Sequence, residues 1–336
     1  MTYSSHLLWV QPFWLEQASQ WVDHILDQQG IKRVGAIAQP RIRAWSTILQ
    51  IPTQIGDLYF KAVIPDLAYE AALTKALFRW FPDCVPQILA IDPQRGWLFM
   101  ADGGIKLRDV LKTTDDIQHW EALLPSYAKL QQESAQYVDE LLEMGVCDRR
   151  LATLPTQFQA LLDDEDAIAL DHANGLTLDE YQQLQTCFDR VVRMCERLAT
   201  FGIPETLHHG DLHDGNIFIS DSCYRFFDWG DSSISHPFFS LHNTYHSLKR
   251  DFNLNADSDW FKRLKSSYLN AWTDDEPTEQ LELGFALAQQ LAPIPAALRW
   301  LPVLSSMDAT THDKYVGAVP ALMRELLHSV VESGSC

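Results

Sequence analysis

The residues best placed to do chemistry lie in one stretch, LHHGDLHDGNIFISDSCYRFFDWGDSSISHPFFSL, over residues 207–241. His209, Asp211 and Asn216 follow the order H-x-D-x-x-x-x-N, and Asp228 comes later, beyond an apolar run. Transfer of a phosphoryl group to a hydroxyl needs a carboxylate that orients and deprotonates the hydroxyl, and oxygen ligands for the Mg²⁺ on the nucleotide phosphates. Kinases supply these groups with an Asp, an Asn five residues later and a second Asp after a hairpin. The spacing therefore favours phosphoryl-transfer chemistry.

This stretch resembles the aminoglycoside phosphotransferase and choline kinase branch of the kinase-like fold, whose loop usually reads H-G-D-x-x-x-x-N. The ordered motifs that carry the resemblance cover about residues 30–245. The resemblance implies that Asp211 is the catalytic base and that Asn216 and Asp228 ligate Mg²⁺. It implies ATP as the phosphoryl donor, leaves GTP open, and gives His209 a bracing role in the loop.

Two charged residues upstream support this interpretation. Lys61 lies in the strand-like segment LYFKAVI, and Glu70 is the only acidic residue of the helical segment that follows. Kinase-like folds pair a strand lysine, which contacts the α- and β-phosphates, with a glutamate of the next helix. The resemblance therefore assigns Lys61 and Glu70 to nucleotide binding.

The resemblance also suggests where the rest of the nucleotide binds. Met100 and Asp102 close the last predicted strand before two glycines, at the place of the hinge whose backbone groups contact adenine. The hairpin of residues 42–60 lacks the G-x-G-x-x-G loop of protein kinases. Aminoglycoside phosphotransferases use a hydroxyl-bearing loop there, so Ser46 is assigned to the phosphates, with Arg43 as the alternative.

One position departs from the family pattern. Ser240 ends the segment P-F-F-S, where the family commonly has an Asp that buttresses the catalytic loop. The sequence does not indicate how this loop keeps its rigidity without that Asp, or whether the reaction is slower.

The predicted elements give an α+β, two-lobed, protein-kinase-like fold. A β-β-α-β-β order over residues 31–102 predicts a small antiparallel sheet with one helix, after an amphipathic helix that Gly30 ends. We expect an N-lobe at residues 1–101, which binds nucleotide, and a helical C-lobe at residues 102–336, which holds the catalytic loop and the acceptor site. Helical patterns in the C-lobe cover residues 118–144, 178–201, 238–250, 258–272, 278–296 and 319–332. The segments NIFIS and YRFFD, around an Asp221-Ser222 turn, are the only expected strands there.

Charge is unevenly distributed along the chain. The net charge is −19, yet residues 1–101 hold eight basic and eight acidic side chains, so the excess lies in residues 102–336. Such a field repels nucleic acid and anionic membranes and attracts cations. Two interpretations stay open: the charge serves solubility, or it attracts a cationic acceptor such as an aminoglycoside or an amino alcohol. The expected partner is a small-molecule hydroxyl acceptor.

Other features bear on location. No apolar run approaches the ~20 residues that span a bilayer, and the N-terminus lacks the basic region of a signal peptide. The six cysteines are scattered without a C-x-x-C pair, which favours reduced thiols. We therefore expect a cytoplasmic protein, whose oligomeric state the sequence does not indicate.

Two other functions fit part of the same stretch. A metal-dependent hydrolase would use histidines and Asp211 as a metal cluster, although no layered α/β pattern surrounds the loop. Its candidate ligands are His208, His209, Asp211, His213 and His236. A non-catalytic nucleotide-binding pseudokinase is the second alternative, and only Ser240 favours it.

Overall fold

The computed structural model describes residues 8–170, 172–220, 223–273 and 278–332. The Asp221-Ser222 turn, Cys336 and the first seven residues of the chain lie outside these ranges. The chain divides into two compact units, which are described separately below. Unit 1 comprises residues 1–106, 217–230 and 302–314, and unit 2 comprises residues 107–216, 231–301 and 315–336.

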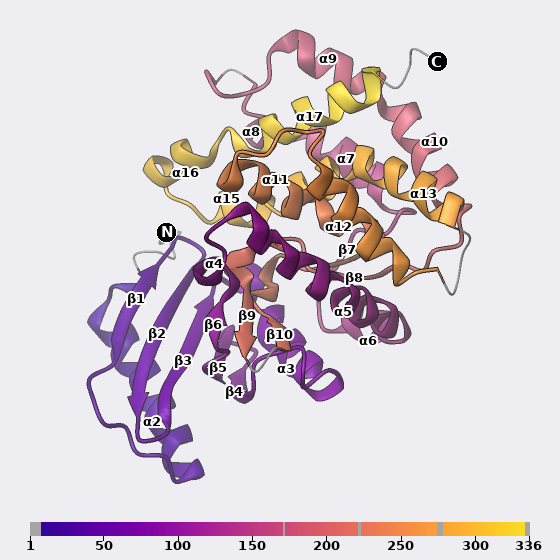
Figure 1. The fold of residues 1–336 in the computed structure, drawn as a ribbon. Helices are drawn as coiled ribbons and strands as arrows, with labels where there is room; N and C mark the ends of the chain where they lie inside the picture. Colours follow the sequence, from indigo (N-terminus) through magenta and orange to yellow (C-terminus); the bar gives the residue numbers. More distant parts are fainter. Residues whose placement is uncertain (1–7, 171, 221–222, 274–277, 333–336) are drawn as a thin grey trace. The chain divides into compact units, whose positions relative to one another are not determined.

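Unit 1 is built on a five-stranded antiparallel sheet with the order β1-β2-β3-β5-β4 (Figure 1). Its strands are β1 (Ala38–Ile42), β2 (Ser46–Thr53), β3 (Gly56–Val63), β4 (Ile88–Asp92) and β5 (Trp97–Ala101). A second sheet has the order β10-β9-β6 and consists of β6 (Ile105–Lys106), β9 (Ile217–Ser220) and β10 (Cys223–Phe226). The short helices α15 (Leu301–Ser305) and α16 (Ala309–Tyr315) fall largely within this unit.

The two faces of the large sheet have different roles because successive side chains of a strand point to opposite faces. Phe60 of β3 pairs with Phe99 of β5, and both face helix α2 (Pro12–Gln29), whose Trp21 packs edge-on against each ring. Helix α3 (Tyr69–Trp80) covers the other face, where Ala71 forms a small core with Leu98 and Met100. Lys61 pairs with Leu98 and so lies on the α3 face.

Unit 2 is mostly helical (Figure 1). Its helices are α4 (Leu107–Val110), α5 (Gln118–Ser134), α6 (Val138–Glu143), α7 (Leu154–Asp163), α8 (Glu165–Ile168), α9 (Leu178–Thr186), α10 (Phe188–Ala199), α11 (Leu241–Phe252), α12 (Asp259–Asn270), α13 (Thr278–Leu291), α14 (Pro293–Leu298) and α17 (Ala318–Glu332). Three short strands form a sheet of order β7-β11-β8: β7 (Cys147–Asp148), β8 (Thr206–His208) and β11 (Ser233–Ser235). None of the described helices is long and apolar enough to span a membrane.

The predicted fold class is confirmed, as are the N-terminal helix with Gly30 in the left-handed conformation, the two hairpins and the helix between them. Some predictions about individual elements were wrong. Strand β1, which pairs with β2 through a turn at residues 43–45, was missing from the prediction. Strands β7, β8 and β11 are absent from the prediction, since runs of two or three residues are too short to show alternation.

Candidate active site

In unit 1, Lys61, Glu70 and Asp228 form one charged cluster. The Nζ atom of Lys61 donates to Glu70 Oε1 at 2.6 Å and also hydrogen-bonds the carboxylate of Asp228. Lys61 is only 5% exposed and Glu70 only 2%, so little water screens the pair. Burial lowers the pKa of Lys61, but the two carboxylates outweigh it and raise the pKa above its ordinary value. Lys61 is therefore a fixed positive charge held between two acids.

The backbone at Asp228 is unusual for a residue with a side chain. Its φ is +67°, in the left-handed region where Asp and Asn are the commonest residues after Gly. The following Gly230 accepts a hydrogen bond on its carbonyl oxygen from the Tyr69 hydroxyl, which ties this turn to α3. The turn thus holds the Asp228 carboxylate against Lys61.

The predicted hinge residues lie at the end of β5, with Met100 in the strand and Asp102 directly after it. Met100 is buried in the core against α3, while the Asp102 carboxylate accepts a hydrogen bond from the Gly104 backbone N–H at 3.0 Å. A Cβ at Gly103 would lie 2.1 Å from the Phe218 ring, so only glycine lets the chain pass this ring. These contacts fix the course of the segment after the sheet.

Ser46 is the first residue of β2 and pairs with Val63. Lys61 precedes Val63 by two residues on β3, so Ser46 and Lys61 belong to the same face of the sheet. Ser46 is 5% exposed, whereas Arg43 in the adjoining turn is exposed. Ser46 therefore lies at the start of a strand and not within the turn, on the sheet face of Lys61, and its role at the phosphates remains a prediction.

In unit 2, the catalytic loop follows β8 and ends in a 3-10 turn, Asp214–Asn216. Gly210 has φ +79°, and a Cβ there would lie 2.1 Å from the Asp231 carbonyl oxygen. The glycine of the H-G-D motif is therefore required by close backbone packing. His209 is fully buried, and its Nδ1 accepts a hydrogen bond from the Asp211 backbone N–H at 3.3 Å, in agreement with the bracing role expected for it.

Asp211 is surrounded by donors. Its Oδ1 accepts hydrogen bonds from Arg299 Nη1 at 2.7 Å and from Asn243 Nδ2 at 3.0 Å. Its Oδ2 accepts one from Asn216 Nδ2 at 3.1 Å and lies 3.3 Å from His213 Nε2. Burial raises the pKa of Asp211, but the Arg299 charge and the other donors hold it well below its ordinary value. Asp211 is thus a charged and rigidly oriented carboxylate.

No sequence pattern indicates Arg299 or Asn243, which contact Asp211 from the C-terminal end of α14 and from α11. Arg299 follows the last residue of α14 and also donates to Asp231 Oδ2 at 3.2 Å. Its Nε is buried and makes no hydrogen bond within the described residues. This guanidinium therefore pairs with two carboxylates at once.

Asn216 has an orientation that fits a metal ligand. Its amide nitrogen donates to the Asp211 carbonyl oxygen at 3.0 Å as well as to the carboxylate, so its amide oxygen is directed away from Asp211. Hard cations such as Mg²⁺ prefer oxygen ligands. Asn216 belongs to unit 2, and Asp228, the other predicted Mg²⁺ ligand, belongs to unit 1.

His213 and Asp214 also belong to this network. Arg108 donates to Asp214 Oδ1 at 2.8 Å and to His213 Nδ1 at 3.2 Å. The Gly215 backbone N–H also donates to His213 Nδ1 at 2.9 Å. His213 is thereby oriented with Nε2 toward Asp211, which places it closer to the predicted base than the sequence indicated.

Ser240 takes part in a buried, uncharged network that reaches the catalytic loop. Its Oγ lies 3.2 Å from the Tyr127 hydroxyl and accepts a hydrogen bond from Gln131 Nε2 at 3.1 Å. The Tyr127 hydroxyl accepts a hydrogen bond from the His209 backbone N–H at 3.1 Å, and Gln131 donates to the Leu207 carbonyl. Neutral groups of α5 therefore support the loop where relatives commonly use an Asp.

The metal cluster that a hydrolase would need does not form. In the ranges that the structure describes, the only three metal-ligating side chains that converge are His242, His246 and Glu325. Of the five ligands expected for that alternative, His208 and His236 are buried in the core.

The sequence matches the model of the phosphotransferase enzyme family, known as APH, over residues 85–281. The chain belongs to this family. The match includes the catalytic loop, Asn216 and Asp228, while Lys61 and Glu70 precede it. No curated protein matches the chain in sequence.

Solved structures share the kinase-like fold of this family member. An ethanolamine kinase from Plasmodium vivax has a TM-score of 0.62 at 16% identity, over 95% of this chain and 89% of its own. A macrolide 2'-phosphotransferase from Brachybacterium faecium has a TM-score of 0.58 at 16% identity, over 88% of this chain and 96% of its own. An amicoumacin kinase in complex with AMP-PNP, Ca²⁺ and its antibiotic has a TM-score of 0.53 at 13% identity, over 91% and 93% of the two chains.

Proposed function

We propose that this protein is an ATP- and Mg²⁺-dependent kinase that transfers the γ-phosphoryl group to a hydroxyl of a small molecule. The observation that carries the proposal is the environment of Asp211, a partly buried carboxylate held by four side chains in the loop of a phosphotransferase family member. Solved relatives of the same fold act on small molecules, and one was captured with a nucleotide analogue and a divalent cation.

The residues of the two units fit the roles that this reaction needs. Asp211 accepts the hydrogen bond of the acceptor hydroxyl, aligns its oxygen with the phosphorus and receives its proton. Phosphoryl transfer has a loose transition state, so orientation matters more than base strength, and the low pKa of Asp211 suits that role. Lys61, positioned by Glu70, neutralises the α- and β-phosphates. Asn216 and Asp228 offer oxygen ligands to Mg²⁺, whose charge would stabilise the transferred group.

The remaining nucleotide contacts come from unit 1. We assign the adenine edge to the backbone around Met100 and Asp102, and the phosphates to Ser46, which shares the sheet face of Lys61. The acceptor is assigned to unit 2, which carries Asp211. The acidity of residues 102–336 favours a cationic acceptor such as an aminoglycoside or amino alcohol.

A screen of hydroxyl compounds for stimulated ATP consumption tests the function. We expect at least one cationic alcohol to raise consumption, with a phosphorylated product seen by mass spectrometry. Nucleotide binding without turnover against every acceptor class would support the pseudokinase alternative. The same screen with GTP decides which nucleotide is used.

Replacing Asp228 by Asn should raise the Mg²⁺ concentration needed for half-maximal activity. Asn tolerates the left-handed backbone at this position and removes only the charge, whereas Ala would add strain at φ +67°. Titration of Mg²⁺ at fixed ATP measures the effect. An unchanged Mg²⁺ requirement in a folded variant would contradict the assignment.

Replacing Arg299 by Gln should make kcat sensitive to acid. Arg299 is the main group that lowers the pKa of Asp211 against the effect of burial, so its removal raises that pKa. Asp211 then becomes protonated as the pH falls, and the base is lost. We expect the ratio of kcat at pH 8 to kcat at pH 5.5 to be larger in the variant than in the wild type.

The pH profile separates this role from a structural one. A variant that is merely destabilised would lose activity with its folded fraction, which thermal unfolding at each pH measures. Parallel pH profiles for the two folded proteins would show that Arg299 does not set the protonation of Asp211.

A further inference from the structure

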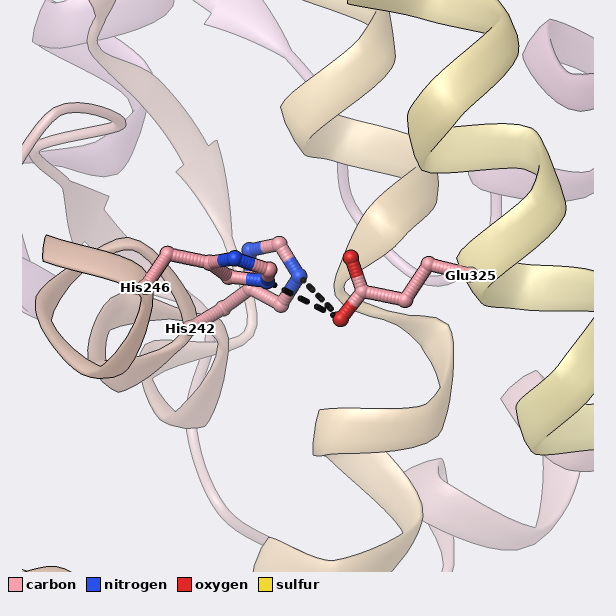
Figure 2. A group of neighbouring side chains, drawn as sticks. All are labelled: His242, His246 and Glu325. Carbon is pink, nitrogen blue, oxygen red and sulfur yellow. Dashed lines mark hydrogen bonds and ion pairs between the residues drawn. The ribbon is translucent and has the colours of Figure 1, made fainter. Parts of the chain in front are cut away.

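Three side chains of unit 2 that the proposed reaction does not use converge on one point. Figure 2 shows His242 and His246 of α11 facing Glu325 of α17. The Nε2 atoms of the two histidines lie 3.1 and 3.0 Å from the same carboxylate oxygen, Glu325 Oε1. The cluster joins two helices that are far apart in the sequence.

The spacing on α11 explains why the two histidines lie side by side. Residues four apart lie on the same helix face, so His242 and His246 present adjacent rings, whose centroids are 4.5 Å apart. Pairs of histidines with this spacing are the helix-borne part of many zinc sites. Glu325 supplies a third ligand from the C-terminal helix.

We propose that His242, His246 and Glu325 bind a divalent transition-metal ion, Zn²⁺ in particular. Two histidines and one glutamate are a ligand set that proteins use for Zn²⁺, with the fourth position taken by water or another ligand. Imidazole ligands select transition metals over Mg²⁺, which prefers oxygen. This site is therefore distinct from the Mg²⁺ ligands proposed above.

The geometry needs little change to accept the ion. All three ligand atoms already lie within 4.8 Å of one another. Tetrahedral Zn²⁺ with bonds of about 2.0–2.1 Å separates its ligands by about 3.4 Å. The two nitrogen–oxygen distances of 3.1 and 3.0 Å must therefore widen by a few tenths of an ångström, and each ring must carry its hydrogen on Nδ1.

The exposure of the three side chains also suits a metal. The side chains of His246 and Glu325 are 47% and 37% exposed, so an ion can enter and a water can complete its coordination. His242 is 9% exposed on its side chain.

The helix that carries the two histidines also contacts the catalytic loop. Asn243, next to His242 on α11, donates to Asp211, and Thr244 donates to the Leu212 carbonyl. A bound ion would fasten α17 to the helix that orients the predicted base. Zinc would therefore stabilise the enzyme without taking part in phosphoryl transfer.

Calorimetric titration of the chelator-treated full chain with ZnCl₂ tests the proposal, with MgCl₂ as the oxygen-preferring comparison. We expect one Zn²⁺ per chain, a raised Tm on binding, and no competition from Mg²⁺. His246→Gln and Glu325→Gln should each weaken Zn²⁺ binding by more than the roughly 10–100-fold that loss of an outer, orienting partner costs. Glu325→Gln keeps an oxygen that can accept from the histidines.

His328→Gln is the matched control, because His328 is an exposed histidine of the same helix, lies outside the three-residue cluster and hydrogen-bonds the Arg324 carbonyl. It should bind Zn²⁺ like the wild type. Two results would overturn the proposal: no binding of micromolar Zn²⁺ by the wild type, or equal binding by the wild type and both ligand variants. In the first case the three residues form only a hydrogen-bonded contact between helices.

Discussion

The Asp211→Asn variant should turn over about 10²–10⁴-fold more slowly than the wild type, the usual loss when a positioned general base is removed. Asn keeps the volume of the side chain but replaces a charged acceptor by an amide. The acceptor hydroxyl then loses the group that aligns it and takes its proton. Initial rates of ATP consumption with a saturating acceptor measure the effect.

The Asp211→Asn substitution should also lower the stability of the protein. Arg299, Asn243 and Asn216 all donate to this carboxylate, so the amide nitrogen of an Asn must face at least one donor. An unsatisfied buried group costs about 1–3 kcal/mol of stability. The variant should therefore have a lower Tm and still bind nucleotide.

Asp189→Asn is the control, because Asp189 is exposed on α10 and its replacement removes the same charge. It should keep both activity and Tm. Wild-type turnover by folded Asp211→Asn would remove Asp211 from the role of base. Loss of nucleotide binding would show instead that the variant had failed to fold.

Local patterns in the sequence predicted the elements of unit 1 well. Alternation over seven or eight residues marks β2 and β3, and Gly30 and Pro82 lie just beyond the ends of α2 and α3. The spacing from Asp211 to Asn216 was also sufficient to predict that the two side chains lie together. Both belong to one loop, and the amide of Asn216 donates to the Asp211 carboxylate. Such features depend on neighbours in the chain.

Contacts between distant segments could not be predicted in this way. Arg299 reaches Asp211 from 88 residues away, and nothing in the sequence around it distinguishes it from a surface arginine. Ser240 looked like the loss of a buttress, yet Tyr127 and Gln131 connect it to the loop through hydrogen bonds. Which neutral groups replace a charge depends on packing, and a single sequence does not show packing.

Replacing Lys61 by Met should impair both stability and the use of ATP. Lys61 and Glu70 are almost fully buried, so removing the cation breaks a buried ion pair. Breaking a buried pair in this way costs about 3–5 kcal/mol. Loss of a fixed charge at the phosphates should lower kcat/KM for ATP on the order of 10²-fold, as loss of one stabilising donor does in other active sites.

Adding Glu70→Gln to this variant separates the two effects. The double variant no longer carries the uncompensated Glu70 charge, so it should recover part of the stability that Lys61→Met loses. It should not recover the use of ATP, since no cation is restored at the phosphates. Glu70→Gln alone should have the mildest effect on kcat/KM, because Lys61 keeps its contact with Asp228.

A double-mutant cycle with both measurements then assigns the pair its role. Two results are expected if Lys61 binds nucleotide and Glu70 positions it. The two substitutions are strongly coupled in the free energy of unfolding, and kcat/KM for ATP is low in both variants that lack Lys61. If the double variant regains ATP use along with stability, the pair is a structural contact alone. Additive effects on unfolding would mean that the 2.6 Å contact contributes little to the fold.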